Sequence, residues 1–157
     1  AAACWRCHPG AQVGNFARRN ADLEHEQRLI ELLIEGVATG AIASAHDVSD
    51  GGLAVALAEC CFAGPARVGA RVELSDSLRP DALVFGESTG RVIAATADAP
   101  RLLALAASHG VPAHAIGTTG GDRLSIGPPG ERPWIDEPVE ALHAIWQGAI
   151  PRRLREG

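Results

Sequence analysis

Apolar residues in the first third of the chain recur at helical spacing. Leu29, Leu33 and Val37 lie four residues apart, acidic residues fill the turn ahead of them, and Gly40 follows. Acidic side chains suit the positive end of a helix, and glycine commonly ends one. The pattern therefore predicts an amphipathic helix over residues 22–40.

A second helix is predicted after a short apolar strand over residues 42–45. Leu53 and Leu57 lie four residues apart, and Cys60 and Cys61 follow one turn later, which places them all on one helical face up to about Phe62. We therefore expect both thiols to face the core, where a free cysteine packs as a small hydrophobic side chain.

The rest of the chain alternates between strand and helix patterns. Every second residue from Val68 to Leu74 is apolar, which is typical of a half-buried strand. Two glycines at 120 and 121 separate apolar segments and predict a hairpin. The other predicted elements are strands over 90–97, 113–118 and 123–126, and helices over 80–85, 99–109 and 138–146. This order predicts an α/β fold, a mixed sheet covered by helices.

Composition and charge narrow the class of protein. The chain has 157 residues, of which 46% are hydrophobic and 21% charged, as expected for one folded domain. Its net charge is −5, and its basic clusters are limited to residues 18–19 and 152–155, so we expect no nucleic-acid partner. No apolar run approaches the roughly 18 residues of a membrane helix, so we expect a soluble, cytoplasmic protein without a membrane partner.

Residues 1–19 show no periodic pattern, and we expect an irregular or disordered lead there. An α/β domain should follow over 20–151, with a basic tail over 152–157. Within the lead, Cys4, Cys7 and His8 match the C-x-x-C-H pattern of covalent haem attachment, which would indicate an electron carrier. The absence of methionine for the usual axial ligand and of a secretory segment favours incidental thiols over haem or half a zinc site.

The stretch AHDVSDGGL at 45–53 carries the clearest chemistry. It joins a predicted strand to a glycine-led helix, whose free N–H groups suit a phosphate. Asp47 and Asp50 would repel a phosphate unless Mg²⁺ bridged them, and Asp47 is our candidate metal ligand. The structural alternative is that Ser49 or Asp50 only caps the helix and the glycines only form a turn. The candidate nucleotide-binding residues are Asp47, Ser49, Gly51 and Gly52.

Two further groups of residues are candidates on weaker grounds. Glu87, Ser88 and Thr89 place an acid and two hydroxyls between a predicted helix and strand, where they can bind a substrate ribose or amide, or simply cap and turn the chain. His46 adjoins the aspartates, yet a histidine in a strand more often has a structural role than that of a general base.

Three motifs in a fixed order give the chain a family resemblance. They are AHDVSDGGLAVALAECCFAG at 45–64, VFGESTGRVI at 84–93 and IGTTGGDRLSI at 116–126. Together they resemble the C-terminal domain of phosphoribosylformylglycinamidine synthase, the formylglycinamide ribonucleotide amidotransferase of purine biosynthesis, within the aminoimidazole ribonucleotide synthetase-like ATP-binding superfamily. The resemblance covers about residues 21–151. Aminoimidazole ribonucleotide synthetase and selenophosphate synthetase share the two-domain plan, but DVSDGGLAVALAE with FGES favours the amidotransferase.

The resemblance implies an ATP-dependent ligation with ATP and Mg²⁺ as cofactors. In the family, ATP activates the amide oxygen of formylglycinamide ribonucleotide, and ammonia from a glutaminase subunit or domain displaces the phosphate to give the amidine. The preceding domains of the synthetase, the glutaminase and the nucleotide substrates are therefore the implied partners. No residue here matches the family's catalytic histidine, so we assign no catalytic residue and expect the chain alone to be inactive. The competing hypothesis is a structural or interaction domain of another ATP-using member. Whether the motifs face a catalytic or a structural nucleotide site stays open.

Overall fold

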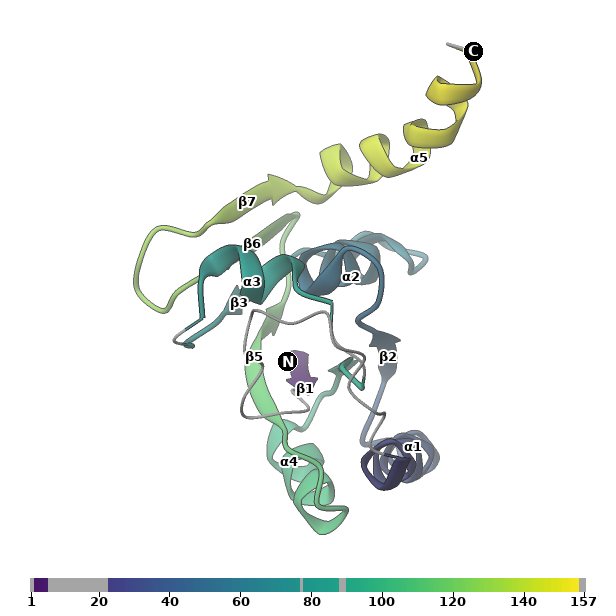
Figure 1. The fold of residues 1–157 in the computed structure, drawn as a ribbon, viewed down its shortest axis with the longest axis vertical. Helices are drawn as coiled ribbons and strands as arrows, with labels where there is room; N and C mark the ends of the chain where they lie inside the picture. Colours follow the sequence, from purple (N-terminus) through teal and green to yellow (C-terminus); the bar gives the residue numbers. More distant parts are fainter. Residues whose placement is uncertain (1, 6–22, 77, 88–89, 156–157) are drawn as a thin grey trace.

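A computed structural model describes residues 2–5, 23–76, 78–87 and 90–155 (Figure 1). Within these parts the strands are β1 (Ala2–Trp5), β2 (Ser44–Asp47), β3 (Ala70–Glu73), β4 (Val92–Ala95), β5 (His114–Thr119), β6 (Arg123–Gly127) and β7 (Ile135–Pro138). The helices are α1 (Leu23–Ala38), α2 (Gly52–Phe62), α3 (Pro80–Phe85), α4 (Ala99–Ser108) and α5 (Val139–Arg155). The described strands form one seven-stranded sheet in the order β2-β4-β1-β5-β3-β6-β7.

The sheet is mixed, because β3 and β6 pair in parallel while the other neighbours are antiparallel. Helices pack on both of its faces. Side chains alternate along a strand, so in β4 Ile93 contacts one hydrophobic cluster while Val92 and Ala94 contact another. The first cluster includes residues of α2, α3 and α5, and the second includes residues of α1 and α4. The predicted α/β fold is confirmed.

Helices α1 and α4 are joined by polar contacts as well as by their apolar faces. His109 Nε2 lies 2.8 Å from Glu35 Oε2, and Arg101 Nη2 donates to the Thr39 carbonyl at 2.8 Å. Asp98 is the N-cap of helix α4, and its side chain accepts a hydrogen bond from the Arg101 amide at 3.1 Å. The pair forms the end of the molecule that lies lowest in Figure 1.

The buried face of α1 differs from the predicted one. Leu29, Leu32 and Gly36 are buried, whereas Leu33 is only half-buried and Val37 is 61% exposed. A Cβ on Gly36 would lie 2.5 Å from Ile42 Cδ1, so the helix approaches the following segment at its glycine. The apolar arc of α1 is wider than the surface that covers it, and the four-residue spacing alone did not show which part of the arc would be covered.

The prediction that both cysteines face the core is wrong for one of them. Cys61 is buried, but Cys60 is exposed. The buried face of α2 runs through Leu53, Leu57 and Cys61 at four-residue intervals. Cys60 is turned from Cys61 by the roughly 100° that separate successive residues of a helix, which takes it off that face.

The predicted hairpin between 113–118 and 123–126 is also wrong. Strand β3 lies between β5 and β6 and pairs with both. The Gly120–Gly121 turn spans the start of β3, where the Gly69 amide donates to the Gly121 carbonyl and the Gly120 amide donates to the Gly69 carbonyl, each at 2.8 Å. A Cβ on Gly69 would lie 2.3 Å from the Arg123 carbonyl oxygen, so this insertion requires glycine.

The ends of the chain also differ from the sequence expectation. Ala2–Trp5, within the expected irregular lead, form β1 between β4 and β5; the remainder of that lead, with Cys7 and His8, lies outside the described residues. The strand β7 was not predicted. Helix α5 continues through Pro151 into the expected basic tail.

Candidate functional site

The turn between β2 and α2 places the predicted nucleotide-binding residues at one edge of the sheet. Asp47 is the last residue of β2, and its side chain is 73% exposed. Ser49 and Asp50 are also exposed. Gly51 is the N-cap of α2, with φ 81°, so the cap residue has no side chain of its own that could bond to the first turn of the helix. The alternative in which Ser49 or Asp50 caps α2 through its side chain is therefore not what the structure shows.

Gly52 brings the start of α2 against the end of α3. Its φ is 71°, and a Cβ there would lie 2.6 to 2.8 Å from the carbonyl carbon, Cα and carbonyl oxygen of Phe85. Only glycine fits that contact without moving the backbone of one of the two helices. Part of the glycine motif therefore has a packing role in addition to any role in binding.

Glu87 joins the first two sequence motifs. Its Oε1 accepts a hydrogen bond from the Gly51 amide at 3.0 Å, across 36 residues of chain. A carboxylate at the positive end of a helix is electrostatically favourable. The Glu87 carboxylate thus occupies one of the amides at the start of α2 that the glycine pattern predicted to bind a phosphate. Ser88 and Thr89, the other candidate substrate-binding residues, lie outside the described residues.

A shallow hollow of about 660 Å³ lies between α1 and this turn. One side is apolar and comes from α1, with Leu29, Ile30 and Leu33. The remaining lining is mainly polar and comes from the β2–α2 turn and the segment that leads into β4. The charged members of this part are Asp47, Asp50, Glu87 and Arg91, and α1 adds Glu26. With four carboxylates and one guanidinium, the hollow favours a cation, or an anion that arrives with its own cation.

Glu26, Ile30 and Arg91 line the hollow but were not among the predicted site residues. The signal for Glu26 was present in the acidic first turn of the predicted helix, where it also suited the helix dipole. Arg91 donates through Nη1 to the Gly86 carbonyl at 3.1 Å and so fixes the segment that carries Glu87. The periodicity of α1 gave no information about which segment its partly covered face would meet.

His46 has a structural environment. Its Nδ1 lies 2.6 Å from the Asp47 carbonyl oxygen, and its Nε2 lies 3.5 Å from Glu59 Oε2 on α2. The imidazole therefore links the end of β2 to α2. This arrangement agrees with the structural role that the sequence favoured for it.

The third motif lies apart from the hollow. Arg123 on β6 donates from Nε to Asp136 Oδ1 at 2.9 Å and from Nη2 to the Asp136 carbonyl at 2.7 Å. The Arg123 guanidinium thereby lowers the pKa of the Asp136 carboxyl. Because none of residues 116–126 lines the hollow, the structure brings together only the first and second motifs.

Among the described residues, no group of three or more His, Cys, Asp or Glu side chains is arranged to hold a metal ion. Magnesium in nucleotide sites is commonly held by one or two carboxylates together with water and phosphate oxygens. The exposed Asp47 and Asp50 fit that mode, and they do not fit an all-protein cage. None of the described helices is long and apolar enough to cross a membrane.

Comparison with known proteins identifies the class first. Residues 9–127 match the family described as "AIR synthase related protein, C-terminal domain", and the chain belongs to that family.

Within that class, the chain is similar to one particular enzyme subunit. It is 41% identical over 131 residues to the phosphoribosylformylglycinamidine synthase subunit PurL of Thermomicrobium roseum, a match that covers 80% of this chain and 17% of the relative. It therefore spans about a sixth of the length of that protein.

Two solved structures share the fold. PurLQS from Thermotoga maritima aligns with a TM-score of 0.77 and 22% identity, covering 90% of this chain and 25% of that one. Thermotoga maritima PurL complexed with ATP aligns with a TM-score of 0.73 and 23% identity over the same shares. At these identities the likeness establishes the fold.

Proposed function

We propose that this chain is the C-terminal part of a phosphoribosylformylglycinamidine synthase, an ATP-dependent C–N ligase of purine biosynthesis. The observation that carries the proposal is the hydrogen bond between the Gly51 amide and Glu87, which brings the first two motifs together beside one hollow. The 41% identity to a PurL subunit supports the same assignment. The substrates would be formylglycinamide ribonucleotide, ATP and ammonia.

The hollow would take a nucleotide together with Mg²⁺. Asp47 is exposed at the end of β2, and its carboxylate is a hard oxygen ligand that suits this ion. Bound Mg²⁺ would offset phosphate charge beside the carboxylates of the hollow. Ser49 and the backbone around Gly51 and Gly52 would contact the nucleotide. Glu87, with Ser88 and Thr89, would bind the substrate side. A nucleotide-bearing Thermotoga maritima PurL structure supports ATP as the ligand.

We assign no catalytic residue to this chain, since its polar groups fit binding and electrostatic stabilisation better than covalent catalysis. The preceding synthetase domains would supply the catalytic groups, and a glutaminase would supply ammonia. The chain by itself, assayed with ATP, Mg²⁺, formylglycinamide ribonucleotide and ammonia, should show no turnover. Steady amidine formation by the chain alone would contradict this division of labour.

The role of Asp47 is tested by Asp47→Asn in a synthetase that contains this chain and its preceding domains. The substitution keeps shape and hydrogen bonding but removes the charge, so Mg-nucleotide binding should weaken by about 1 to 3 kcal/mol. The difference should shrink when Mg²⁺ is withheld from both proteins. Titration calorimetry measures both quantities.

Asp122→Asn is the matched control, since Asp122 is an exposed aspartate that does not line the hollow. It should leave binding unchanged. If Asp47→Asn binds the Mg-nucleotide as tightly as the parent does, the first motif is a structural turn and the site assignment fails.

A further inference from the structure

Arg91 belongs to the second sequence motif and is bonded to residues of both motifs that meet at the hollow. Its backbone carbonyl accepts a hydrogen bond from the Val48 amide at 2.9 Å, and Val48 lies between Asp47 and Ser49 in the first motif. Its Nη1 donates to the Gly86 carbonyl at 3.1 Å. One residue therefore ties the β2–α2 turn to the segment that follows α3.

The acceptor of the side-chain bond belongs to the peptide group that joins Gly86 to Glu87. The Gly86 amide donates to the Ala82 carbonyl at 3.2 Å, so Gly86 is held both by its amide and by its carbonyl. Glu87 starts from this fixed peptide group, and its Oε1 accepts from the Gly51 amide at 3.0 Å. The Arg91 guanidinium thus sets the position from which Glu87 reaches the start of α2.

Arg91 also lies in the wall between two hollows. It lines the hollow beside α1 and a second one of about 420 Å³, which Leu53 of α2 and Leu83 of α3 line as well. A residue in such a wall is placed to support the groups around it. Because the guanidinium already donates to a backbone carbonyl, this placement favours support of Glu87 over direct contact with a bound phosphate.

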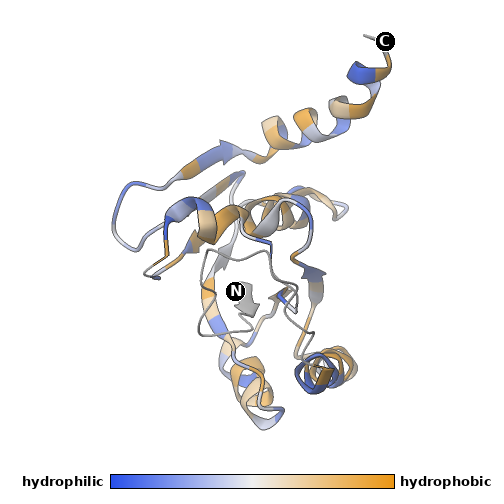
Figure 2. Ribbon diagram, in the orientation of Figure 1, coloured by the Kyte–Doolittle hydropathy of each residue, from blue (hydrophilic) through white to orange (hydrophobic). Residues whose placement is uncertain are grey.

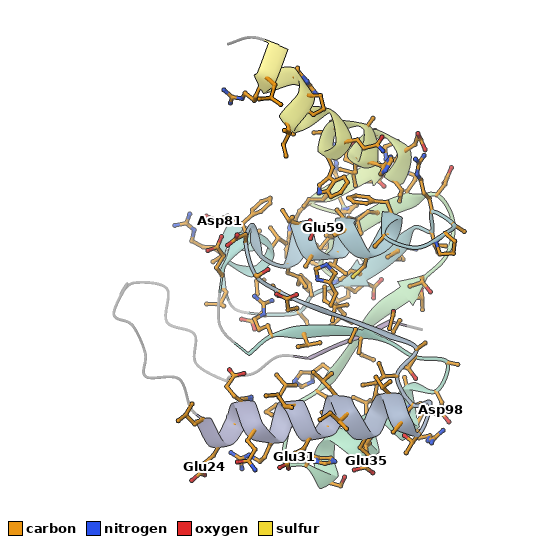
Figure 3. All side chains as sticks on the ribbon, turned by 90° about the vertical axis from the view of Figure 1, so that its right-hand side faces the viewer. Glu24, Glu31, Glu35, Glu59, Asp81 and Asp98 are labelled. Carbon is orange, nitrogen blue, oxygen red and sulfur yellow. The ribbon has the colours of Figure 1, made fainter. Side chains whose placement is uncertain are left out.

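The helices α2 and α3 have apolar contacts that do not depend on these polar bonds. One buried hydrophobic cluster contains Leu53, Leu57, Leu83 and Val84. Figure 2 shows hydrophobic residues over most of α2. In Figure 3, α2 with Glu59 and α3 with Asp81 lie on the face of the sheet opposite α1. Loss of the Arg91 guanidinium should therefore release Glu87 without separating the two helices.

We propose that Arg91 is a positioning residue for the substrate side of this site. It keeps the Glu87 carboxylate on the Gly51 amide through Oε1, so that Oε2 accepts from a hydroxyl or an amide N–H of the ribonucleotide. The inference rests on the proposed function, which assigns Glu87 to formylglycinamide ribonucleotide. A charged acceptor that is already held in place costs less to order when the substrate binds. Binding of the Mg-nucleotide, which depends on Asp47, should depend little on Arg91.

The first test is hydrogen exchange of the Gly51 amide in this chain, measured by NMR. Arg91→Met and Glu87→Ala should each accelerate the exchange by about fivefold or more, because the carboxylate no longer protects the amide. Arg71→Met is the matched control, since Arg71 lies on β3, is 76% exposed and lines neither hollow. It should leave the exchange unchanged. Exchange that Arg91→Met does not accelerate would overturn the proposal.

The second test is steady-state kinetics of a synthetase that contains this chain and its preceding domains. Arg91→Met should raise the KM for formylglycinamide ribonucleotide by about fivefold or more and leave the KM for ATP within about twofold. In a Glu87→Ala background the same substitution should add little, since no carboxylate remains to be positioned. Arg91→Lys replaces Arg91→Met if the latter does not fold.

Two kinetic results would contradict the positioning role. They are effects of Arg91→Met and Glu87→Ala that multiply in the double variant, and a rise in the KM for ATP alone. Either result would indicate that the guanidinium contacts a ligand directly. An assembled synthetase that forms no amidine would instead overturn the proposed function, while the exchange of the Gly51 amide would still decide whether Arg91 positions Glu87.

Discussion

Two glycines with nearly the same backbone conformation differ in what surrounds them. Gly40 and Gly52 have φ values of 69° and 71°, but nothing lies within 4 Å of a Cβ placed on Gly40. A Cβ on Gly52 would meet the Phe85 backbone at 2.6 Å. Alanine substitutions at these two glycines therefore distinguish the free-energy cost of an unfavourable φ from the additional cost of a steric clash.

We expect Gly40→Ala to lower the free energy of unfolding by about 1 kcal/mol, which is the usual cost of a left-handed alanine. Gly52→Ala should lower it by about 3 kcal/mol or more, since the backbone of α2 or α3 must also move. Urea denaturation measures both changes. Equal losses would show that the contact between α2 and α3 tolerates a side chain.

The two thiols of α2 contribute to the stability of this chain at alkaline pH. Although Cys60 is an exposed residue, partial desolvation of its thiol raises the pKa from 9.0 to about 11, with a further contribution from the charge of Glu59. Burial also raises the pKa of Cys61 to about 11, with a smaller effect from Cys60. The sequence contains no tyrosine, and its basic side chains outside histidine are all arginine. Among side chains, cysteine alone therefore has an ordinary pKa between 8 and 10.4 here.

The folded state holds these protons more tightly than the unfolded state does. The resulting stability is fully present below pH 9 and is lost as the pH rises through 11. The loss should be about 1–2 kcal/mol once the partial exposure of the thiols is allowed for. Thermal unfolding at pH 7 and at pH 11 measures it. A Cys60→Ser, Cys61→Ser variant should lose less stability over the same range.

At the scale of elements, the insertion of β3 between β5 and β6 depends on Gly69. Gly69→Ala would place a Cβ 2.3 Å from the Arg123 carbonyl and 2.9 Å from the Gly120 carbonyl. We expect a loss of about 2–4 kcal/mol in unfolding free energy, because two strands must separate to accept it. Gly64→Ala is the control, since its Cβ would lie 3.6 Å from its nearest neighbour, and it should change stability by less than about 1 kcal/mol. Denaturation of both variants tests this, and similar losses would contradict it.

The elements that sequence alone predicted well are those whose pattern is local. Helices α3 and α4 begin at Pro80 and Ala99, as the pattern indicated, because proline and a capping aspartate act on their own turn of helix. Strand β2 begins two residues later than predicted, at Ser44. Strand β7 escaped prediction, because neither Asp136 nor Glu137 marks a strand and its pairing with β6 is a tertiary property.

The errors in topology and in the site have a common cause. A glycine pair between apolar runs predicts a turn, but nothing in it shows that a strand from fifty residues earlier lies inside that turn. In the same way, Asp47 and Glu87 were each recognisable as candidates. That both line one hollow, with Glu87 bonded to the Gly51 amide, depends on how α3 packs on α2, which no local pattern records.

At the scale of the whole molecule, the sheet is continuous only through its first strand. Strand β1 is the neighbour of both β4 and β5, which pair with no other strand on those sides. Residues 2–5 thus join β2 and β4 on one side to the other four strands. This segment is short, yet the hydrogen bonds between the two parts of the sheet pass through it.

Removal of residues 2–5 would divide the sheet into two parts that share no backbone hydrogen bonds. A chain of residues 6–157 should expose the backbone groups of β4 and β5 in a gap one strand wide, and such edges recruit any extended peptide. We expect this shortened chain to aggregate, which light scattering would measure. A synthetic peptide of residues 1–5, added separately, should prevent the aggregation. The same peptide with Ala3 replaced by proline should not, because proline lacks a backbone donor. Behaviour identical to that of the full chain would mean that the two parts hold together through their helices alone. If the rescue succeeds, the gap between β4 and β5 is a site at which binding of a five-residue peptide controls whether this chain folds.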